Sequence, residues 1–332
     1  MLGTASILNC LYILALVLIF TILIIKLFKN FLGLDIIDIS EYLGGKFLKI
    51  LIGILCIGYL IMEAAFLTRM FSKNLLLVYF DNYPIAFIIL LFLFVAVVAN
   101  LFDKKSIIKS NTIIVPITLI SILLTVIFVV DLFRIERSLP IFGNGADKIF
   151  LTGASNIFAF NGLFFLFFLS PMLEKKENTS KVAFASVLIC GLFLLFAIAI
   201  LVYSFSDIYS ISRISPIYFI IVNSNLSAFL ERPEILFIFI WALALMSFIS
   251  IAVMFCLEIW KKLSHSKEAK SLAGAVCAII FVVSMLIDNV FTLETVANAF
   301  YKYGTLVLVF GIFTLLLIGA NIKKKLGGKI DE

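Results

Sequence analysis

Long apolar stretches alternate with short polar segments along the whole chain. Nine of these stretches carry few or no charged side chains, and an α-helix needs about 20 apolar residues to cross the hydrocarbon core of a bilayer. The stretches lack the alternation of apolar and polar residues that strands of a membrane β-barrel show. The pattern predicts nine transmembrane helices, at about residues 5–26, 48–71, 83–101, 110–131, 149–173, 182–206, 234–258, 270–288 and 303–322.

One further segment, residues 212–230, is only partly apolar. It contains Arg213, Pro216 and two asparagines, and a charged side chain is costly in the centre of a bilayer. We therefore expect a short helix packed on the outer surface of the protein. The remaining pattern is continuous enough to predict one transmembrane domain over residues 1–332.

Composition assigns the chain to the membrane proteins. Of its 332 residues, 64% are hydrophobic and 14% are charged, whereas about a quarter of the residues in a soluble domain are charged. The predicted fold class is therefore an all-α polytopic membrane protein. The net charge of +6 is no sign of nucleic-acid binding, because basic residues of membrane proteins gather in the loops on one side of the bilayer.

The distribution of basic residues predicts the orientation. When the loops are assigned alternately to two sides, about two thirds of the 26 Lys and Arg residues fall on one side, which is then cytoplasmic. This places the C-terminus in the cytoplasm and, with nine crossings, Met1 outside. The first span has no basic residue before it, so a signal peptide is a poor explanation. We expect a ten-helix protein whose first helix is missing from this sequence; the alternative is a nine-helix protein with an exported N-terminus.

Catalytic and metal-binding patterns are missing from the sequence. The single histidine, His265, has no second histidine with which to form a metal site, and no phosphate-binding GxxxxGK motif occurs. The cysteines have no CxxC spacing and lie singly inside the predicted spans, as small apolar residues do: Cys10, Cys56, Cys190, Cys256 and Cys277. We expect neither an enzyme nor a bound cofactor or metal.

The predicted span 149–173 is interrupted at its middle by Asn161 and Gly162. Glycine weakens a helix by about 1 kcal/mol relative to alanine, and asparagine side chains compete for backbone hydrogen bonds. We therefore expect a local unwinding, of the kind that forms solute sites at the membrane midplane of many transporters. The alternative is that small residues let two helices approach closely, with asparagine as an interhelical hydrogen-bonding group.

Other polar residues within spans extend the list of candidates. Glu63 is a carboxylate inside a predicted span, where such groups usually face a partner, a cavity or the bundle interior. Ser247 and Ser250 either line a site or pack helices together through their hydroxyl groups. The candidate ligand-binding residues are Glu63, Ser155, Phe158, Asn161, Gly162, Ser247 and Ser250.

Several stretches, in their order and spacing, resemble the B subunits of spore germination receptors, the endospore germination permeases. They are IDISEYLGGKFLKILIG from residue 37, LTRMFSKNL from residue 67, LPIFGNGADKIFLTGASNIFAFNG from residue 139 and FLERPEILFIFIWALALMSFISIAVMF from residue 229. The likeness covers nearly the whole chain. It implies the inverted-repeat fold of the amino acid–polyamine–organocation transporter superfamily, with ten helices, of which this chain lacks the first.

The resemblance also implies a function. The chain would sense a small nutrient germinant, expected to be an amino acid, in the spore inner membrane. It would signal to an A subunit and a lipoprotein C subunit, with membrane lipids as further partners and no nucleic acid. Many relatives carry a glutamate where this sequence has Phe164, so recognition of an ammonium group at that position is not expected. The alternatives are a proton-coupled amino acid transporter, with Glu63 as proton carrier, and a paralogue without binding activity.

Overall fold

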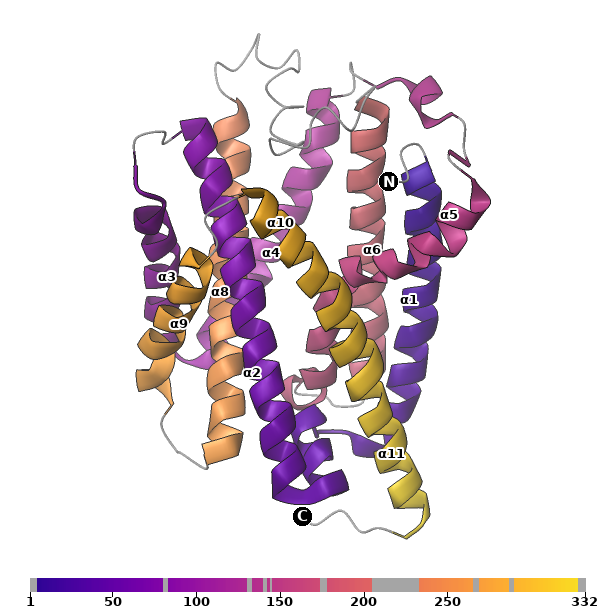
Figure 1. The fold of residues 1–332 in the computed structure, drawn as a ribbon, viewed down its shortest axis with the longest axis vertical. Helices are drawn as coiled ribbons and strands as arrows, with labels where there is room; N and C mark the ends of the chain where they lie inside the picture. The colour runs from indigo at the N-terminus through magenta and orange to yellow at the C-terminus, as the bar shows by residue number, and fades with distance from the viewer. Residues whose placement is uncertain are drawn as a thin grey trace. The chain divides into compact units, whose positions relative to one another are not determined.

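The computed structural model describes residues 5–79, 83–129, 133–139, 142–143, 145–173, 178–204, 233–264, 269–286 and 290–327 (Figure 1). All regular secondary structure within these ranges is helical. The predicted all-α class of a polytopic membrane protein is therefore confirmed. The surface helix predicted at residues 212–230 lies outside the described residues.

The α-helices (α) alternate with 3-10 and π-helical segments (η). In chain order they are α1 (Ser6–Phe28), η2 (Lys29–Phe31), α2 (Ile36–Tyr79), α3 (Ile85–Leu101), α4 (Lys104–Val129), η4 (Ile135–Ser138), α5 (Ala146–Phe150), η5 (Thr152–Phe168), η6 (Ser170–Met172), α6 (Thr179–Ser204), α8 (Pro233–Ser264), η9 (Lys270–Leu272), α9 (Ala273–Met285), α10 (Val290–Ala299), η10 (Phe300–Gly304), η11 (Leu306–Phe313) and α11 (Thr314–Lys325).

Within the described residues, each of the nine predicted spans overlaps helical structure. In the described part of the chain, seven helices are long and apolar enough to cross a membrane, and two shorter apolar helices cover Ile85–Leu101 and Lys270–Met285. At 1.5 Å per residue the 17 residues of α3 extend about 25 Å, slightly less than the hydrocarbon thickness of about 30 Å. A short predicted span is therefore matched by a short helix.

Four helical regions extend well beyond their predicted spans. Helix α2 runs from Ile36 to Tyr79, against a predicted span of 48–71, and α8 ends at Ser264, six residues after its predicted end. Helix α4 begins at Lys104, six residues before the predicted start, and the predicted span 303–322 lies inside helical structure that runs from Val290 to Lys325. Polar residues such as Lys104 and Glu294 lower the local hydropathy, but lysine and glutamate are good helix formers. Hydropathy therefore located the apolar parts of these helices and not their ends.

The contacts within the chain divide it into two compact units. Unit 1 comprises Met1–Ile52, Arg134–Ser206 and Asn298–Glu332, and unit 2 comprises Gly53–Phe133 and Asp207–Ala297. Each unit is thus assembled from segments far apart in the sequence. The prediction of a single transmembrane domain stays a prediction.

Unit 1 is built on the packing of α1 against α6 (Figure 1). The buried residues of α1 recur every three or four positions, which places them on one face of the helix: Asn9, Cys10, Ile13, Leu14, Val17, Thr21, Ile24 and Phe28. Gly191 of α6 lies so close to Leu14 that a Cβ atom at this position would come within 2.2 Å of the leucine side chain. Glycine at 191 therefore allows the close approach of the two helices.

Aromatic side chains fill the other part of the unit 1 core. Phe164 and Phe167 of η5 pack on Phe313 of η11, with ring centroids 5.7 and 4.9 Å apart, and Phe167 also contacts Phe28 at 5.9 Å. All four rings are buried. Burying a phenylalanine side chain stabilises the fold by about 1.5–3 kcal/mol if it would otherwise be exposed to water. If it would otherwise be exposed to lipid, the stabilisation comes from close packing.

Helix α2 changes direction near its beginning. Asp35 precedes the helix, and its Oδ1 accepts hydrogen bonds from the backbone N–H groups of Ile37 and Asp38 at 3.0 and 3.2 Å, as an N-cap residue does. The helical path is then broken at Gly44 and at Gly45, where φ is +69°. Only glycine adopts such a conformation at little cost, so these two residues separate a short first helix from the long membrane helix.

In unit 2, α8 packs against both α3 and α4, and α3 also packs against α9. Asn100 of α3 is buried, and its Nδ2 donates hydrogen bonds to the carbonyl oxygens of Ala96 at 2.9 Å and Ser250 at 3.0 Å. One amide thus satisfies its donors and joins α3 to α8. Interhelical bonds of this kind contribute about 0.6 kcal/mol on average in membrane proteins.

Candidate functional site

The predicted helix interruption is confirmed, one residue before Asn161. Phe160 has φ −98° and ψ 39°, outside the helical region, and divides η5 into two parts. The whole of η5 is 3-10 helix over 17 residues, although 3-10 runs longer than three or four residues are uncommon. A 3-10 helix rises about 2.0 Å per residue, so the eight residues on each side of Phe160 extend about 16 Å along their own axis.

A cavity lies beside the interruption, wholly within unit 1. Its volume is about 470 Å³, within the range of roughly 300–1,000 Å³ typical of small-molecule sites. Asn161 and Gly162 line it, and nothing lies within 4 Å of a Cβ atom placed on Gly162. The other lining residues are Ala159, Phe160, Leu163, Phe165, Leu166 and Leu169 of the η5 region and Ala183, Ser186, Val187, Cys190 and Leu194 of α6.

The cavity has an apolar wall with few polar groups. Asn161, Ser186 and Cys190 supply the polar side chains, and the lining includes no charged residue. Such a lining suits a small solute with an apolar part and a few groups that form hydrogen bonds. Charged ends of a solute would have to be met by backbone groups near the break at Phe160.

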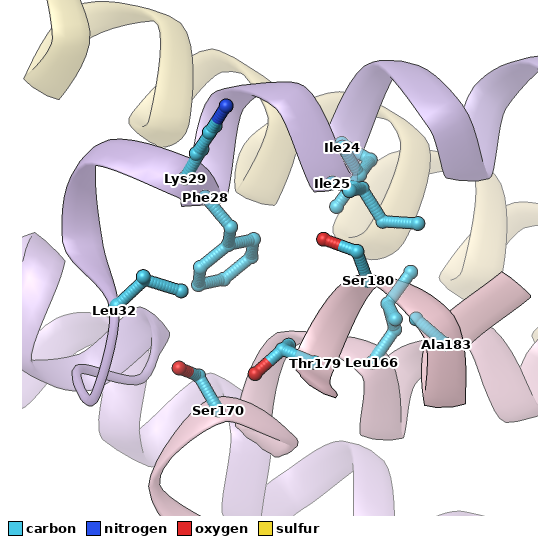
Figure 2. Close-up of a pocket in the computed structure, with 10 residues that line it drawn as sticks. All are labelled: Ile24, Ile25, Phe28, Lys29, Leu32, Leu166, Ser170, Thr179, Ser180 and Ala183. Atoms are coloured by element: carbon cyan, nitrogen blue, oxygen red, sulfur yellow. The ribbon is translucent and has the colours of Figure 1, made fainter. Parts of the chain in front are cut away.

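A second, much smaller cavity adjoins the first in unit 1. Its volume of about 10 Å³ has space for about one water molecule, and Leu166 and Ala183 line both cavities. Figure 2 shows hydroxyl groups of Ser170, Thr179 and Ser180 among its lining, while the Lys29 ammonium points away from the other side chains. The Ser170 Oγ also accepts a hydrogen bond of 2.7 Å from the backbone N–H of Gly33, which fixes η6 to the loop after η2.

The N-terminal half of η5 follows the packing alternative. The buried Asn9 of α1 donates a hydrogen bond of 2.8 Å from Nδ2 to the carbonyl of Ile149 and accepts one of 3.0 Å at Oδ1 from Asn156. A Cβ atom on Gly153 would lie 2.3 Å from the Asn9 Nδ2. Gly153 and Asn156 therefore bring η5 and α1 together, whereas Asn161 and Gly162 border open space.

The other two candidates on η5 do not line the cavity. Ser155 donates a hydrogen bond of 2.9 Å from Oγ to the Thr152 carbonyl of its own helix, and Phe158 is half-buried. Neither is among the residues that line the larger cavity. Their part in ligand binding stays a prediction.

The remaining candidates belong to unit 2. Glu63 of α2 is only 2% exposed. Ser247 Oγ donates a hydrogen bond to Asn111 Oδ1 on α4, and Ser250 Oγ donates to the Met246 carbonyl at 2.7 Å. Ser247 thus makes the interhelical contact that the packing alternative predicts, whereas Ser250 bonds a carbonyl of its own helix. A binding role for all three residues stays a prediction.

Sequence reasoning missed the α6 side of the cavity. Ala183, Ser186, Val187, Cys190 and Leu194 line it, with the spacing of one helix face. Helix α6 is apolar on all sides, so no amphipathic pattern marks this face. The spacing of Ser186 and Cys190, the more polar residues of the face, was the available signal.

Comparison with known proteins identifies the family of the chain. A family model described as "Spore germination protein" matches residues 5–292. Spore germination protein B2 of Bacillus subtilis (strain 168) is 27% identical to the chain over 164 residues, which cover 48% of this chain and 45% of that protein. The aligned region thus spans less than half of the curated relative. Because the family model covers most of a chain with multi-pass membrane helices, the protein belongs to the family of spore germination proteins.

Proposed function

We propose that this protein is the germinant-sensing subunit of a spore nutrient germination receptor. Family membership supports a role related to germination receptors. The observation that carries the finer proposal is the cavity of about 470 Å³ beside the break at Phe160. A small nutrient, expected to be an amino acid, would bind there, next to Asn161 and Gly162.

The chemistry of the break supports a small polar solute. In this proposal the non-helical backbone at Phe160 leaves peptide groups beside it available to a solute. At membrane depth such groups are tolerated where they line a cavity. Backbone N–H and C=O groups near Phe160 would therefore bind the charged ends of an amino acid, and the apolar wall would bind its side chain.

Binding would act on the conformation of η5. A ligand shifts a conformational equilibrium only by its difference in affinity for the two states. A 3-10 helix with a central break can change its hydrogen-bonding pattern at low cost, because its geometry is poorer than that of an α-helix. In this proposal the nutrient favours one state of η5, and partner subunits, an A subunit and a lipoprotein C subunit in the spore inner membrane, detect the change. The C-terminus faces the cytoplasm in this arrangement.

Ligand-dependent stabilisation tests the proposal. We expect at least one of the twenty protein amino acids to raise the thermal unfolding midpoint of the purified protein in detergent, since a ligand at 100 times its Kd stabilises by about 2.7 kcal/mol. Asn161→Ala should weaken the apparent affinity about tenfold, by loss of a hydrogen bond in a largely apolar site. Asn30→Ala is the matched control, because Asn30 is exposed and bonds Asn321. Equal shifts in all three proteins, or none, would contradict the proposal.

A second candidate function is proton-coupled transport of an amino acid. The burial of Glu63 within α2 favours it, because buried carboxylates in membrane spans mark proton and substrate pathways. In proteoliposomes with an imposed proton gradient, this function predicts concentrative uptake of a labelled amino acid and its loss in Glu63→Gln. Nutrient binding without uptake in either protein would favour the sensor.

A further inference from the structure

Three lysines surround a small cavity at one end of unit 2. Lys104 begins α4, Lys261 lies in the last turn of α8, and Lys270 begins η9. We call these three residues the basic cluster. The cavity has a volume of about 40 Å³ and is also lined by Asn100, Phe102, Ile107, Met254, Leu257 and Glu258. Three elements, α4, α8 and η9, thus bring positive charges to one place.

The carboxylates nearby do not neutralise the cluster. Glu258 contacts Lys104 at 3.4 Å and Lys261 at 3.2 Å, and Asp103 contacts Lys270 at 2.9 Å. The hydrogen bond and charge of Lys270 lower the pKa of Asp103, so its carboxylate remains charged. Three ammonium groups and two carboxylates leave one net positive charge. Each ammonium group has three N–H donors, and the carboxylates accept hydrogen bonds from only some of them.

The surroundings of the cluster are those of a membrane interface. Phe102, which lines the cavity, is 62% exposed, and Trp260, next to Lys261, is 44% exposed. Aromatic side chains beside lysines at the end of a transmembrane helix mark the level of lipid headgroups. From this level, exposed apolar residues continue along one face of α3 through Leu101, Val98 and Phe94.

We propose that the basic cluster binds the phosphate group of an anionic phospholipid. The phosphate would accept hydrogen bonds from the free donors of Lys104, Lys261 and Lys270, and the acyl chains would lie along the exposed face of α3. The cavity gives the headgroup oxygens a place between α3, α4 and α8. Basic pockets between transmembrane helices bind anionic headgroups for the same electrostatic reason.

Lipid titration of the full-length protein in detergent tests this site. Phosphatidylglycerol should raise the unfolding midpoint more than phosphatidylcholine with the same acyl chains, and the difference should shrink at high salt. Lysines near an anionic surface contribute about a fivefold change in affinity each. We therefore expect an apparent affinity about fivefold weaker in Lys270→Gln and about 100-fold weaker in the triple glutamine variant.

Lys105→Gln is the matched control. Lys105 is exposed, lies next to Lys104 on the same helix and does not line the cavity. It carries the same charge, so a general attraction to anionic lipid would make its loss as costly as that of Lys270. Equal losses in the two single variants would overturn the proposal. Equal stabilisation by inorganic phosphate or glycerol 3-phosphate, without acyl chains, would also overturn the assignment to a lipid. The single variant keeps the test valid if the triple variant does not fold.

Discussion

Replacing Gly153 with alanine is expected to destabilise unit 1 by about 2–4 kcal/mol. The new Cβ atom would lie 2.3 Å from the Asn9 Nδ2 and 2.8 Å from the Lys148 carbonyl oxygen, closer than atoms pack. Overpacking costs about 1–3 kcal/mol. Moving Asn9 aside would also break its hydrogen bonds with Ile149 and Asn156, and a buried polar group without its partner costs about 1–3 kcal/mol. The thermal unfolding midpoint in detergent should fall by roughly 5–10 °C.

Gly162→Ala is the control for this experiment. Both glycines lie in η5, but nothing lies within 4 Å of a Cβ atom on Gly162. Alanine there should leave stability unchanged or raise it by up to about 1 kcal/mol, because alanine favours helical backbone. A similar loss of stability in both variants would show that helix geometry, and not contact with Asn9, decides the effect of Gly153→Ala.

Replacing Gly162 with leucine is expected to weaken the nutrient response about 10- to 100-fold. The leucine side chain would enter the larger cavity, where its atoms would occupy space needed by the solute. Steric overlap between the leucine side chain and a bound solute is expected to cost about 1–3 kcal/mol, as overpacking does, and each 1.4 kcal/mol changes affinity tenfold. The measurement is the concentration of the stabilising amino acid at half-maximal shift of the unfolding midpoint, compared with the wild type.

A second glycine with open space around it provides the comparison. Nothing lies within 4 Å of a Cβ atom placed on Gly274 of α9, and this residue does not line the cavity. Gly274→Leu should therefore leave the half-maximal concentration unchanged. If Gly162→Leu retains the wild-type concentration while the protein stays folded, the cavity beside η5 is not the nutrient site.

The two predictions distinguish helix packing from ligand binding, two roles that the sequence alone does not separate for the small residues of η5. Gly153 and Gly162 lie nine residues apart in the same predicted span, and both fit close helix packing as well as a broken helix. The structure places Gly153 against Asn9 and Gly162 beside a cavity. The packing alternative therefore accounts for Gly153 and Asn156 in the N-terminal half of η5, whereas Asn161 and Gly162 line the cavity.

Local properties of the sequence determined the membrane class, the approximate positions of the apolar helices and the interruption near Asn161. These depend on the hydropathy and backbone preferences of neighbouring residues, and such properties can be read along the chain. Helix ends were less well determined, because residues such as Lys104 are polar and yet favour helix.

The tertiary structure decided which faces meet. Helix α6 is apolar all round, so its sequence does not show that Ser186 and Cys190 face η5. Likewise, Asn111 on α4 accepts a hydrogen bond from the hydroxyl of Ser247, which lies 136 positions later in the sequence. The three lysines of the basic cluster also come from segments far apart in the sequence. Contacts of this kind depend on the rotation and approach of whole helices, which residue type and spacing within one helix leave open.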